Sequence, residues 1–303
     1  MLLIDYVGNT PLVRLDRIAR GRVPSGVEIW AKLEWFNPGG SIKDRAARAI
    51  ILAAERAGIP EGARLLDASS GNTGIAYGML CAARGHRLTL CIPSYANDER
   101  KHLLRAYGVE LIETDAREGS DGAIRRAQAL AAAHPDRFVY LDQYSNPANP
   151  GAHEHGTALE IWSQTAGRVT HFVAGLGTSG TFVGTSRGLR AKNAHIQCVS
   201  VQPTGPGHGL EGLKHMATAI VPKIYDPTIA NADLAAPSLA SFELLRALAK
   251  EEGILAGFSS GAALWGAIEV ARTLTAGVVV TVFPDSGERY VSQASQTKMG
   301  SLC

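Results

Sequence analysis

The chain has 303 residues, 46% of them hydrophobic and 19% charged, with a formal net charge of +2. Because domains usually span about 100–200 residues, this length predicts a globular protein of two lobes. The near-neutral charge, with no dense run of Lys and Arg, argues against a nucleic-acid partner. No apolar run approaches the roughly 18 residues of a membrane helix, so we expect no membrane partner.

The four cysteines lie far apart, without a C-x-x-C pair. This spacing is atypical of a disulfide framework or a cysteine-based zinc site, so we expect no metal and a reducing cytoplasm. The first residues, M-L-L-I-D-Y-V-G-N-T-P-L, contain neither a basic segment nor a small-residue cleavage site, and they do not read as a signal peptide.

Strand-like and helix-like segments alternate along the chain. Residues 27–33 alternate in polarity as a strand does, and residues 43–57 carry apolar residues on one helical face before Gly58. The other expected strands are 64–67, 87–92, 109–113, 138–142, 170–174, 196–201, 254–257 and 278–283. The other expected helices are one ending near 84, 97–107, 121–133, 152–165, one ending near 192, 239–252 and 261–275, with an irregular stretch at 203–237. This alternation predicts an α/β fold with mostly parallel, twisted sheets flanked by helices.

Glycine is abundant, at 33 residues, and it gathers in loops between these elements. The loop Gly175–Gly180, G-L-G-T-S-G, follows a strand and opens a helix, in a formal match to the dinucleotide motif. No acidic residue ends the next strand, which reads S-V-Q-P at 200–203, so we disfavour NAD binding. Two interpretations stay open for this loop: a phosphate cradle at a helix start, or a tight turn that needs glycine for packing.

Two other candidate motifs do not fit the sites that they formally resemble, one because of the order of residues in the chain and one because of residue spacing. Gly257–Gly261, G-F-S-S-G, matches the hydrolase elbow, but that family needs a histidine after the serine and all nine histidines precede it. His153 and His155 lie two apart, whereas helical metal pairs lie four apart, so we interpret them as surface histidines of a helix.

Lys43 lies where a glycine turn enters a helix, and the motif around it is one of six that occur in a fixed order. They are G-N-T-P-L at 8–12, N-P-G-G-S-I-K-D-R at 37–45, S-S-G-N-T-G at 69–74, Q-Y-S-N-P at 143–147, G-T-S-G-T at 177–181 and P-D-S-G-E-R-Y at 284–290. Over essentially the whole chain, these motifs resemble the cysteine synthase (O-acetylserine/O-phosphoserine sulfhydrylase) family of fold-type II pyridoxal-phosphate enzymes. Residues 207–222 are most similar to its B-type branch.

The resemblance implies a tryptophan synthase β-like fold, with a smaller substrate-binding lobe at 41–145 and a larger cofactor-binding lobe at 1–40 plus 146–303. It also implies that Lys43 holds pyridoxal 5′-phosphate as a Schiff base, for which its neutral amine is needed. Because only one of two neighbouring side chains can reach the cofactor ring, Asp285 competes with Ser286 for the contact to the ring nitrogen.

The other implied contacts fall into three sets. Asn72 would bind the ring 3′-oxygen and Ser286 would face the ring nitrogen. The cofactor phosphate would be held by Gly177, Thr178, Ser179, Gly180 and Thr181, where many relatives have Gly at position 179. The substrate α-carboxylate would be bound by Ser69, Ser70, Asn72, Thr73 and Gln143 at a helix start.

The implied reaction is β-replacement: Lys43 removes the α-proton, acetate or phosphate leaves, and a sulfur nucleophile adds to give L-cysteine. Lys214 either attracts a leaving phosphate or is a solvated lysine on a loop, so the choice between O-acetylserine and O-phosphoserine stays open. The alternatives are cystathionine β-synthase or 2,3-diaminopropionate synthase chemistry, threonine/serine dehydration, or a binding protein without activity. The resemblance implies a homodimer, and serine acetyltransferase or a sulfur-carrier protein is a possible partner.

Overall fold

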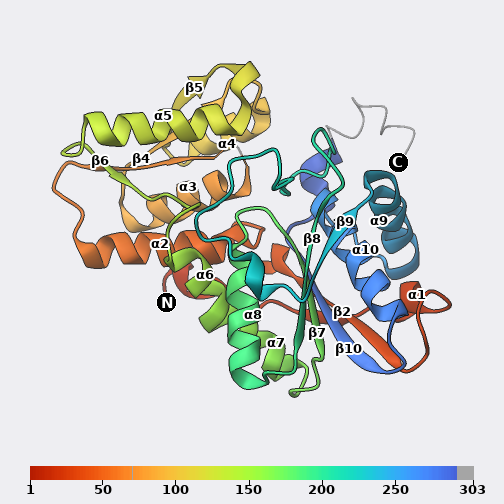
Figure 1. The fold of residues 1–303 in the computed structure, drawn as a ribbon. Helices are drawn as coiled ribbons and strands as arrows, with labels where there is room; N and C mark the ends of the chain where they lie inside the picture. The colour runs from red at the N-terminus through yellow and green to blue at the C-terminus, as the bar shows by residue number, and fades with distance from the viewer. Residues whose placement is uncertain (70, 292–303) are drawn as a thin grey trace.

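The computed structural model describes residues 1–69 and 71–291, and its strands form two sheets, each covered by helices (Figure 1). The smaller sheet is parallel, with strand order β5-β4-β3-β6. Its strands are β3 (Arg64–Ala68), β4 (Leu88–Pro93), β5 (Glu110–Thr114) and β6 (Phe138–Tyr140). The helices around it are α2 (Lys43–Ala57), α3 (Asn72–Arg84), α4 (Asp98–Ala106) and α5 (Gly119–Ala133).

Strand alternation separates the two faces of this smaller sheet. Leu65 packs into a core that contains Ile50 of α2 and Leu80 of α3. Its neighbour Leu66 points the other way and packs against Ile124 of α5. Because both faces are covered, β3 and β4 are almost wholly buried, as expected of a parallel sheet between helices.

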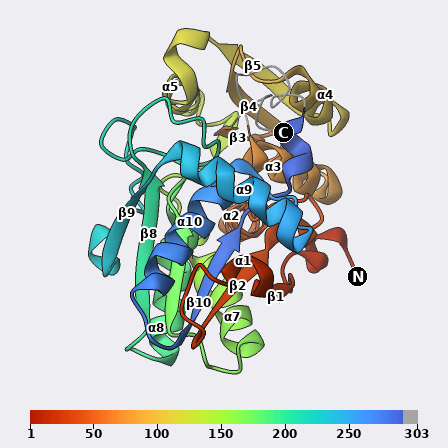
Figure 2. The same cartoon turned by 90° about the vertical axis from the view of Figure 1, so that its right-hand side faces the viewer.

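The larger sheet has strand order β1-β2-β10-β7-β8-β9, in which β1 pairs antiparallel with β2 and the other pairs are parallel. Its strands are β1 (Leu12–Arg14), β2 (Val27–Leu33), β7 (His171–Gly175), β8 (Gln197–Pro203), β9 (Ala232–Ala236) and β10 (Gly277–Phe283). The helices α1 (Asp16–Ala19), α9 (Ser238–Glu252) and α10 (Phe258–Arg272) pack on one face, as Figure 2 shows. The other face is covered by α7 (Ala158–Gln164) and α8 (Gly180–Lys192), and α6 (Ala148–Ala152) packs against α8 and α2.

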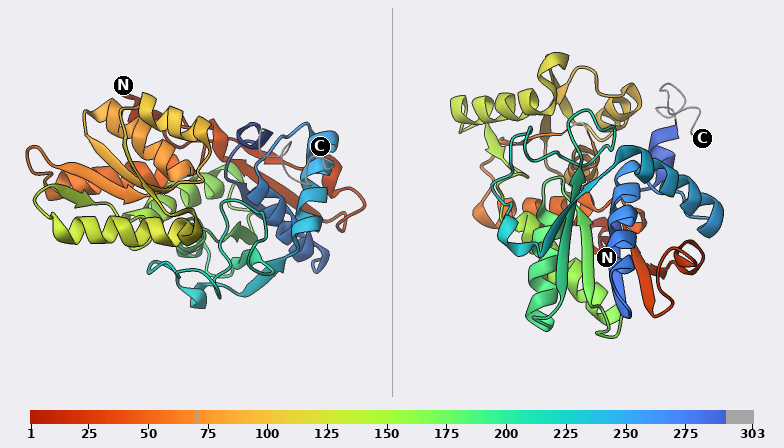
Figure 3. Two further views of the ribbon diagram at one scale, coloured as in Figure 1. Left: turned by 90° about the horizontal axis from the view of Figure 1, so that it is seen from above. Right: turned by 45° about the vertical axis from the view of Figure 1, so that its right-hand side comes forward.

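Seen from above, the smaller sheet and its helices lie beside the larger sheet (Figure 3). Short 3-10 turns lie at Leu3–Tyr6, Glu34–Phe36, Ala116–Glu118, Pro227–Ile229 and Gly287–Tyr290. No helix in the described part of the chain is both long and apolar enough to cross a membrane.

The expected α/β fold is confirmed, with several local differences, among them β1 and α1, which were not expected. Residues 254–257 form no strand; Ala256 makes one isolated bridge, to Ser286. The stretch expected to be irregular contains β9. The helix expected at 152–165 is interrupted by a π-helical turn, His153–Thr157, between α6 and α7. The interpretation of His153 as a surface residue is wrong, because its side chain is buried.

Three glycines on one face of α8 allow this interrupted helix to pack closely against it. A Cβ atom on Gly180 would lie 2.0 Å from the Asn149 side-chain oxygen, and one on Gly184 would lie 2.0 Å from the Pro150 carbonyl. At Gly188 a Cβ atom would meet the Ala158 methyl group at 2.5 Å. The spacing of four residues places all three glycines on one side of the helix. This close contact brings the residues of segment 148–157 to the start of α8.

Candidate active site

A cavity of about 470 Å³ opens between the two sheets, and a narrower recess continues from it toward the larger sheet. Lys43, Asn72, Gly177 and Thr178 line both spaces. The cavity lies where β3 and β7 end and α3 and α8 begin. In open α/β sheets ligands bind at such carboxyl ends of strands, so both spaces are candidates for a ligand site.

Lys43 is the first residue of α2 and projects into this space. The turn before it is fixed to the end of β10, because the Ile42 N–H donates to the Pro284 carbonyl at 2.9 Å. Burial lowers the pKa of Lys43, against the opposing charges of Asp285 and Glu34. A lower pKa increases the share of neutral amine, which is the nucleophilic form of a lysine.

Asn72 begins α3 and joins the two sheets at the recess. Its amide nitrogen donates to the Asp285 carboxylate at 2.6 Å, and its oxygen accepts from Arg289 at 3.0 Å. The Tyr290 hydroxyl donates to the same Asp285 oxygen at 2.5 Å. The other Asp285 oxygen is buried and has no hydrogen-bond partner among the described residues. This chain of contacts fixes the side chains that line the recess opposite Lys43.

The loop Gly177–Thr181 follows β7 and leads into α8, as expected. Ser179 has a left-handed backbone, with φ of +69°, which a serine adopts only at a cost. Its hydroxyl is buried and unpartnered among the residues that the structure describes. A Cβ atom at Gly177 would meet the Gly212 carbonyl at 2.4 Å, so glycine is required there. Free N–H groups at the start of a 13-residue helix and an unpaired hydroxyl fit a phosphate group.

The structure does not bring Ser286 to the recess. Its hydroxyl accepts a hydrogen bond from the Glu288 N–H at 3.3 Å, in the turn that follows β10. The described lining instead includes Asp285 and Ser259, which lies near the start of α10 and is 4% exposed. The sequence did mark Ser259, within the G-F-S-S-G motif between an expected strand and helix. Strand β10 ends three residues before Ser286, at Phe283, so the strand alternation used to separate Ser286 from Asp285 does not extend to them.

The loop expected to bind the substrate carboxylate faces the cavity. Ser69, Asn72, Thr73 and Gln143 line it, whereas Ser70 lies outside the described residues. The Thr73 hydroxyl donates to the Gln143 side chain at 2.8 Å, and Ser69 accepts from the Gly74 N–H at 3.0 Å. The start of α3 and these side chains offer donors suited to an anion.

Asp67, which the sequence patterns did not indicate, lies near the end of β3 and binds the backbone beside this loop. Its carboxylate accepts from the Gln143 N–H at 3.1 Å and from the Ala68 N–H at 2.7 Å. Burial raises the pKa of Asp67 to about 7, against these hydrogen bonds. Its acidic side chain next to the apolar residues Leu65, Leu66 and Ala68 was the signal that could have revealed it.

Lys214 also lines the cavity, and its side chain is 14% exposed. Its ammonium group lies 3.6 Å from the Asp121 carboxylate and 5.0 Å from the centre of the Tyr144 ring. It also donates to the Ile220 carbonyl at 3.4 Å. These contacts hold the ammonium group at the cavity wall, so Lys214 is not a freely solvated residue.

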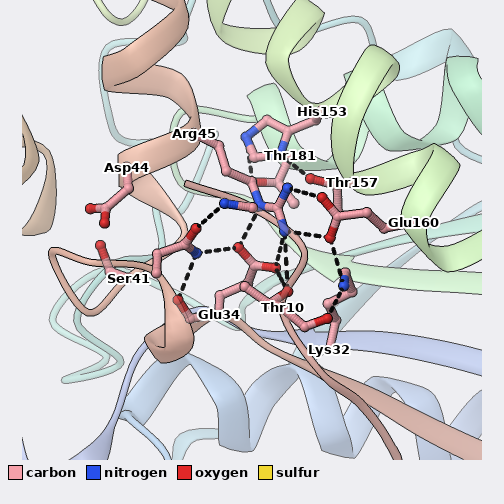
Figure 4. Close-up of polar contacts among 12 residues, drawn as sticks. Thr10, Lys32, Glu34, Ser41, Asp44, Arg45, His153, Thr157, Glu160 and Thr181 are labelled. Carbon is pink, nitrogen blue, oxygen red and sulfur yellow. Dashed lines mark hydrogen bonds and ion pairs between the residues drawn. The ribbon is translucent and has the colours of Figure 1, made fainter. Parts of the chain in front are cut away.

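A buried network of charged groups surrounds Arg45, two residues after Lys43 in the chain (Figure 4). Arg45 pairs with Glu34 at 2.7 Å and with Glu160 at 2.6 Å, and Lys32 pairs with Glu160 at 2.8 Å. Burial raises the pKa of Glu160, but the hydrogen bonds and charges of Arg45 and Lys32 outweigh it and lower that pKa to about 2. The network fixes the start of α2 against segment 153–160 and was not foreseen from the sequence.

Comparison with known proteins shows to which class of proteins this chain belongs. The family model described as pyridoxal-phosphate dependent enzyme matches residues 3–285, so this chain is a pyridoxal-phosphate dependent enzyme. The glycine cradle, the buried lysine and the unpaired serine hydroxyl fit such a cofactor. Among the described residues no group of three His, Cys, Asp or Glu side chains is placed to hold a metal ion.

The relatives narrow the class to one family. The chain is 49% identical over 297 residues to a cysteine synthase of Aquifex aeolicus, covering 96% of this chain and 91% of that protein. It is 42% identical over 291 residues to cysteine synthase B of Salmonella typhimurium, covering 96% and 94%. A crystal structure of cysteine synthase from Entamoeba histolytica matches with a TM-score of 0.91 at 32% identity, covering 99% and 93%. The chain belongs to the cysteine synthase family.

Proposed function

We propose that this protein makes L-cysteine by replacing the β-substituent of O-acetylserine or O-phosphoserine with a sulfur nucleophile. The observation that supports this most directly is that Lys43 and the anion-binding loop at the start of α3 open into the same cavity. A substrate whose carboxylate lies against Thr73 and Gln143 then has its α-carbon on the side of Lys43. Relatives with the printed name cysteine synthase support the same activity.

Each polar group at the site has a defined task in this proposal. When bound, pyridoxal phosphate supplies the electron withdrawal that makes the α-proton of an amino acid acidic. Lys43, with its lowered pKa, removes that proton and returns it at the end of the reaction. Ser69, Thr73, Gln143 and the N–H groups of α3 orient the carboxylate. The loop Gly177–Thr181 holds the cofactor phosphate, and Asn72 contacts the ring.

We assign the contact with the ring nitrogen to Ser259 in place of Ser286, because Ser259 lines the recess. A hydroxyl partner, unlike a carboxylate, does not enforce a protonated ring. This weakens the electron sink and favours elimination of a β-substituent over reactions that need a long-lived carbanion. Asp285 also lines the recess, but one of its oxygens already accepts from Asn72 and Tyr290.

The donor that we favour is O-phosphoserine. Lys214 is held at the cavity wall, where an ammonium group attracts a leaving phosphate more strongly than a leaving acetate.

We further propose that residues 41–145 form the substrate-binding lobe and residues 1–40 plus 146–303 the cofactor-binding lobe. The strands of the smaller sheet all fall within 64–140. A homodimer in the cytoplasm is the expected state of the protein.

The activity is tested by incubating the purified holoenzyme with O-acetylserine or O-phosphoserine and sulfide, and measuring cysteine. The same reaction with homocysteine or an amine as the nucleophile distinguishes cystathionine β-synthase and 2,3-diaminopropionate synthase chemistry. Lys43→Ala should abolish turnover and the visible absorbance of the bound cofactor, while circular dichroism stays unchanged. Cysteine formation by Lys43→Ala, or none by the wild type with either donor, would overturn the proposal.

A further inference from the structure

Two buried side chains lie directly behind the phosphate cradle, and each contacts one of its threonines. Asn149 in α6 and His153 in the π-helical turn are 1% and 2% exposed, and they lie one helical turn apart. The Asn149 amide nitrogen donates to the Thr178 hydroxyl at 3.3 Å. The His153 Nε2 atom lies 3.4 Å from the Thr181 hydroxyl, as Figure 4 shows.

We propose that Asn149 and His153 are positioning residues that turn the hydroxyl protons of Thr178 and Thr181 toward the cofactor phosphate. The proposal rests on the phosphate cradle at 177–181 assigned above. A hydroxyl group has one proton to donate and also accepts hydrogen bonds. When a buried N–H group occupies the acceptor side, the proton is left for an anion. A phosphate dianion needs that proton, because all its oxygens are acceptors.

The direction of the Asn149 contact is fixed by a second bond. The same amide nitrogen donates to the Gln143 backbone carbonyl at 2.7 Å, and a carbonyl accepts but never donates. The nitrogen of Asn149 therefore faces Thr178, and the hydroxyl of Thr178 is the acceptor in that contact. The Asn149 oxygen is buried without a partner among the described residues, which is a cost that the fold accepts to keep this orientation.

The direction of the His153 contact is part of the proposal, because the Thr157 hydroxyl beside the ring can either donate or accept. Burial, and then the charges of Arg45 and Lys43, lower the pKa of His153 well below its ordinary value. A neutral imidazole has one N–H donor and one acceptor nitrogen. Its Nδ1 atom lies 2.9 Å from the Thr157 hydroxyl, which has a proton to donate. With the His153 proton on Nε2, Thr157 donates to His153, His153 donates to Thr181, and Thr181 donates to the phosphate.

The glycines of α8 make this arrangement possible. Gly180 leaves room for the Asn149 side chain, and a Cβ atom on Gly184 would come within 2.9 Å of the His153 Cβ atom. A larger residue at either position would move segment 148–157 away from the two threonines.

The proposal is tested on the apoprotein by titration with pyridoxal phosphate, followed by fluorescence. Thr181→Val and His153→Phe should each weaken cofactor binding on the order of tenfold, as expected for one lost hydrogen bond to a charged group. The double variant should bind no more weakly than Thr181→Val, because His153 acts through Thr181. His153→Gln places an amide N–H near the former Nε2 atom and should recover most of the affinity.

A second measurement separates positioning from a general effect on folding. The 31P resonance of the bound cofactor should titrate at higher pH in His153→Phe, because a phosphate that loses a donor holds its proton more tightly. Circular dichroism and thermal unfolding of each apoprotein verify that it folds.

The measurements separate a failure of the positioning role from a failure of the phosphate cradle. Additive losses in the double variant, or an unchanged 31P titration in His153→Phe, would overturn the positioning role of His153. An unchanged cofactor affinity in Thr181→Val would instead overturn the phosphate cradle itself, and with it this part of the proposed function.

Discussion

The amide of Asn72 donates a 2.6 Å hydrogen bond to the carboxylate of Asp285, 213 residues further along the chain. It joins the helix that begins at the smaller sheet to the end of β10 in the larger one. Asp285 is therefore part of the wall of the recess, and its charge acts on the pKa of Lys43. Asn72, at the end of the smaller sheet, thus holds in place a carboxylate that raises the pKa of the lysine amine.

Removing the charge of Asp285 should change the pH range in which Lys43 reacts. The Asp285 carboxylate raises the pKa of Lys43, so Asp285→Asn should lower that pKa further. The rate at which the apoprotein takes up pyridoxal phosphate, measured by stopped-flow absorbance, should then rise at lower pH than in the wild type. Ser286→Ala is the matched control and should leave the profile unchanged, because Ser286 contacts the Glu288 backbone. Identical profiles for wild type and Asp285→Asn would contradict the charge interaction.

The Lys214 proposal predicts a change in donor preference. Lys214→Ala should lower kcat/KM for O-phosphoserine by roughly tenfold or more, since it removes an interaction with a charged group. The value for O-acetylserine should stay nearly constant. Lys223→Ala, an exposed lysine on the same stretch of chain, is the control and should alter neither value. An unchanged ratio between the two donors in Lys214→Ala would refute the role of this lysine.

The close packing of α8 predicts a large effect of one methyl group. Gly184→Ala should lower the free energy of unfolding by about 1–3 kcal/mol, because the new Cβ atom would overlap the Pro150 carbonyl. Urea unfolding of the apoprotein measures the change. Gly151→Ala, on the facing helix with no described atom within 4 Å of a new Cβ, should be neutral or slightly stabilising. Equal stabilities of the two variants would show that α8 can move away without cost.

Glu160 should make the stability of the protein sensitive to acid. Its pKa falls from an ordinary 4.5 to about 2 in the folded protein, which corresponds to about 3 kcal/mol of stability above pH 4.5. Because the folded pKa is the lower one, this contribution is present above pH 4.5 and is lost as the pH falls toward 2. The stability difference between wild type and Glu160→Gln should therefore be constant near neutral pH and shrink between about pH 4.5 and 2. Chemical unfolding at several pH values measures it, and a difference that grows in acid would contradict the ion-pair account.

Much of the fold and part of the site were predictable because they rest on local patterns. The strand–helix alternation identified the α/β class, and the glycine turns marked Lys43 and Gly177–Thr181. Elements without a strong pattern were missed: β9 reads A-D-L-A-A and has no clear alternation. β1 is three residues long, too short to show a period.

Features that depend on tertiary packing could not be predicted from the strand and helix patterns of the sequence. The resemblance assigned the ring contact to Ser286, and strand alternation was used only to separate it from Asp285. Strand β10 ends at Phe283 and the chain turns there, so the side-chain directions of these two residues do not follow that alternation. His153 was assigned to a surface by helical spacing, but the π-helical turn changes which face its residues occupy. Asp67 and Glu160 are acidic residues whose side chains are largely shielded from solvent, and their partners come from distant parts of the chain.

The glycines at 180, 184 and 188 have a consequence for how the protein folds. Each costs an isolated helix about 1 kcal/mol relative to alanine, so residues 180–192 have little tendency to be helical alone. They gain helical structure when segment 148–164 packs against them. Helix α8 and that segment should therefore form and open as one cooperative unit, with similar amide hydrogen exchange rates. The phosphate cradle at the start of α8 would appear in folding only after that docking step is complete.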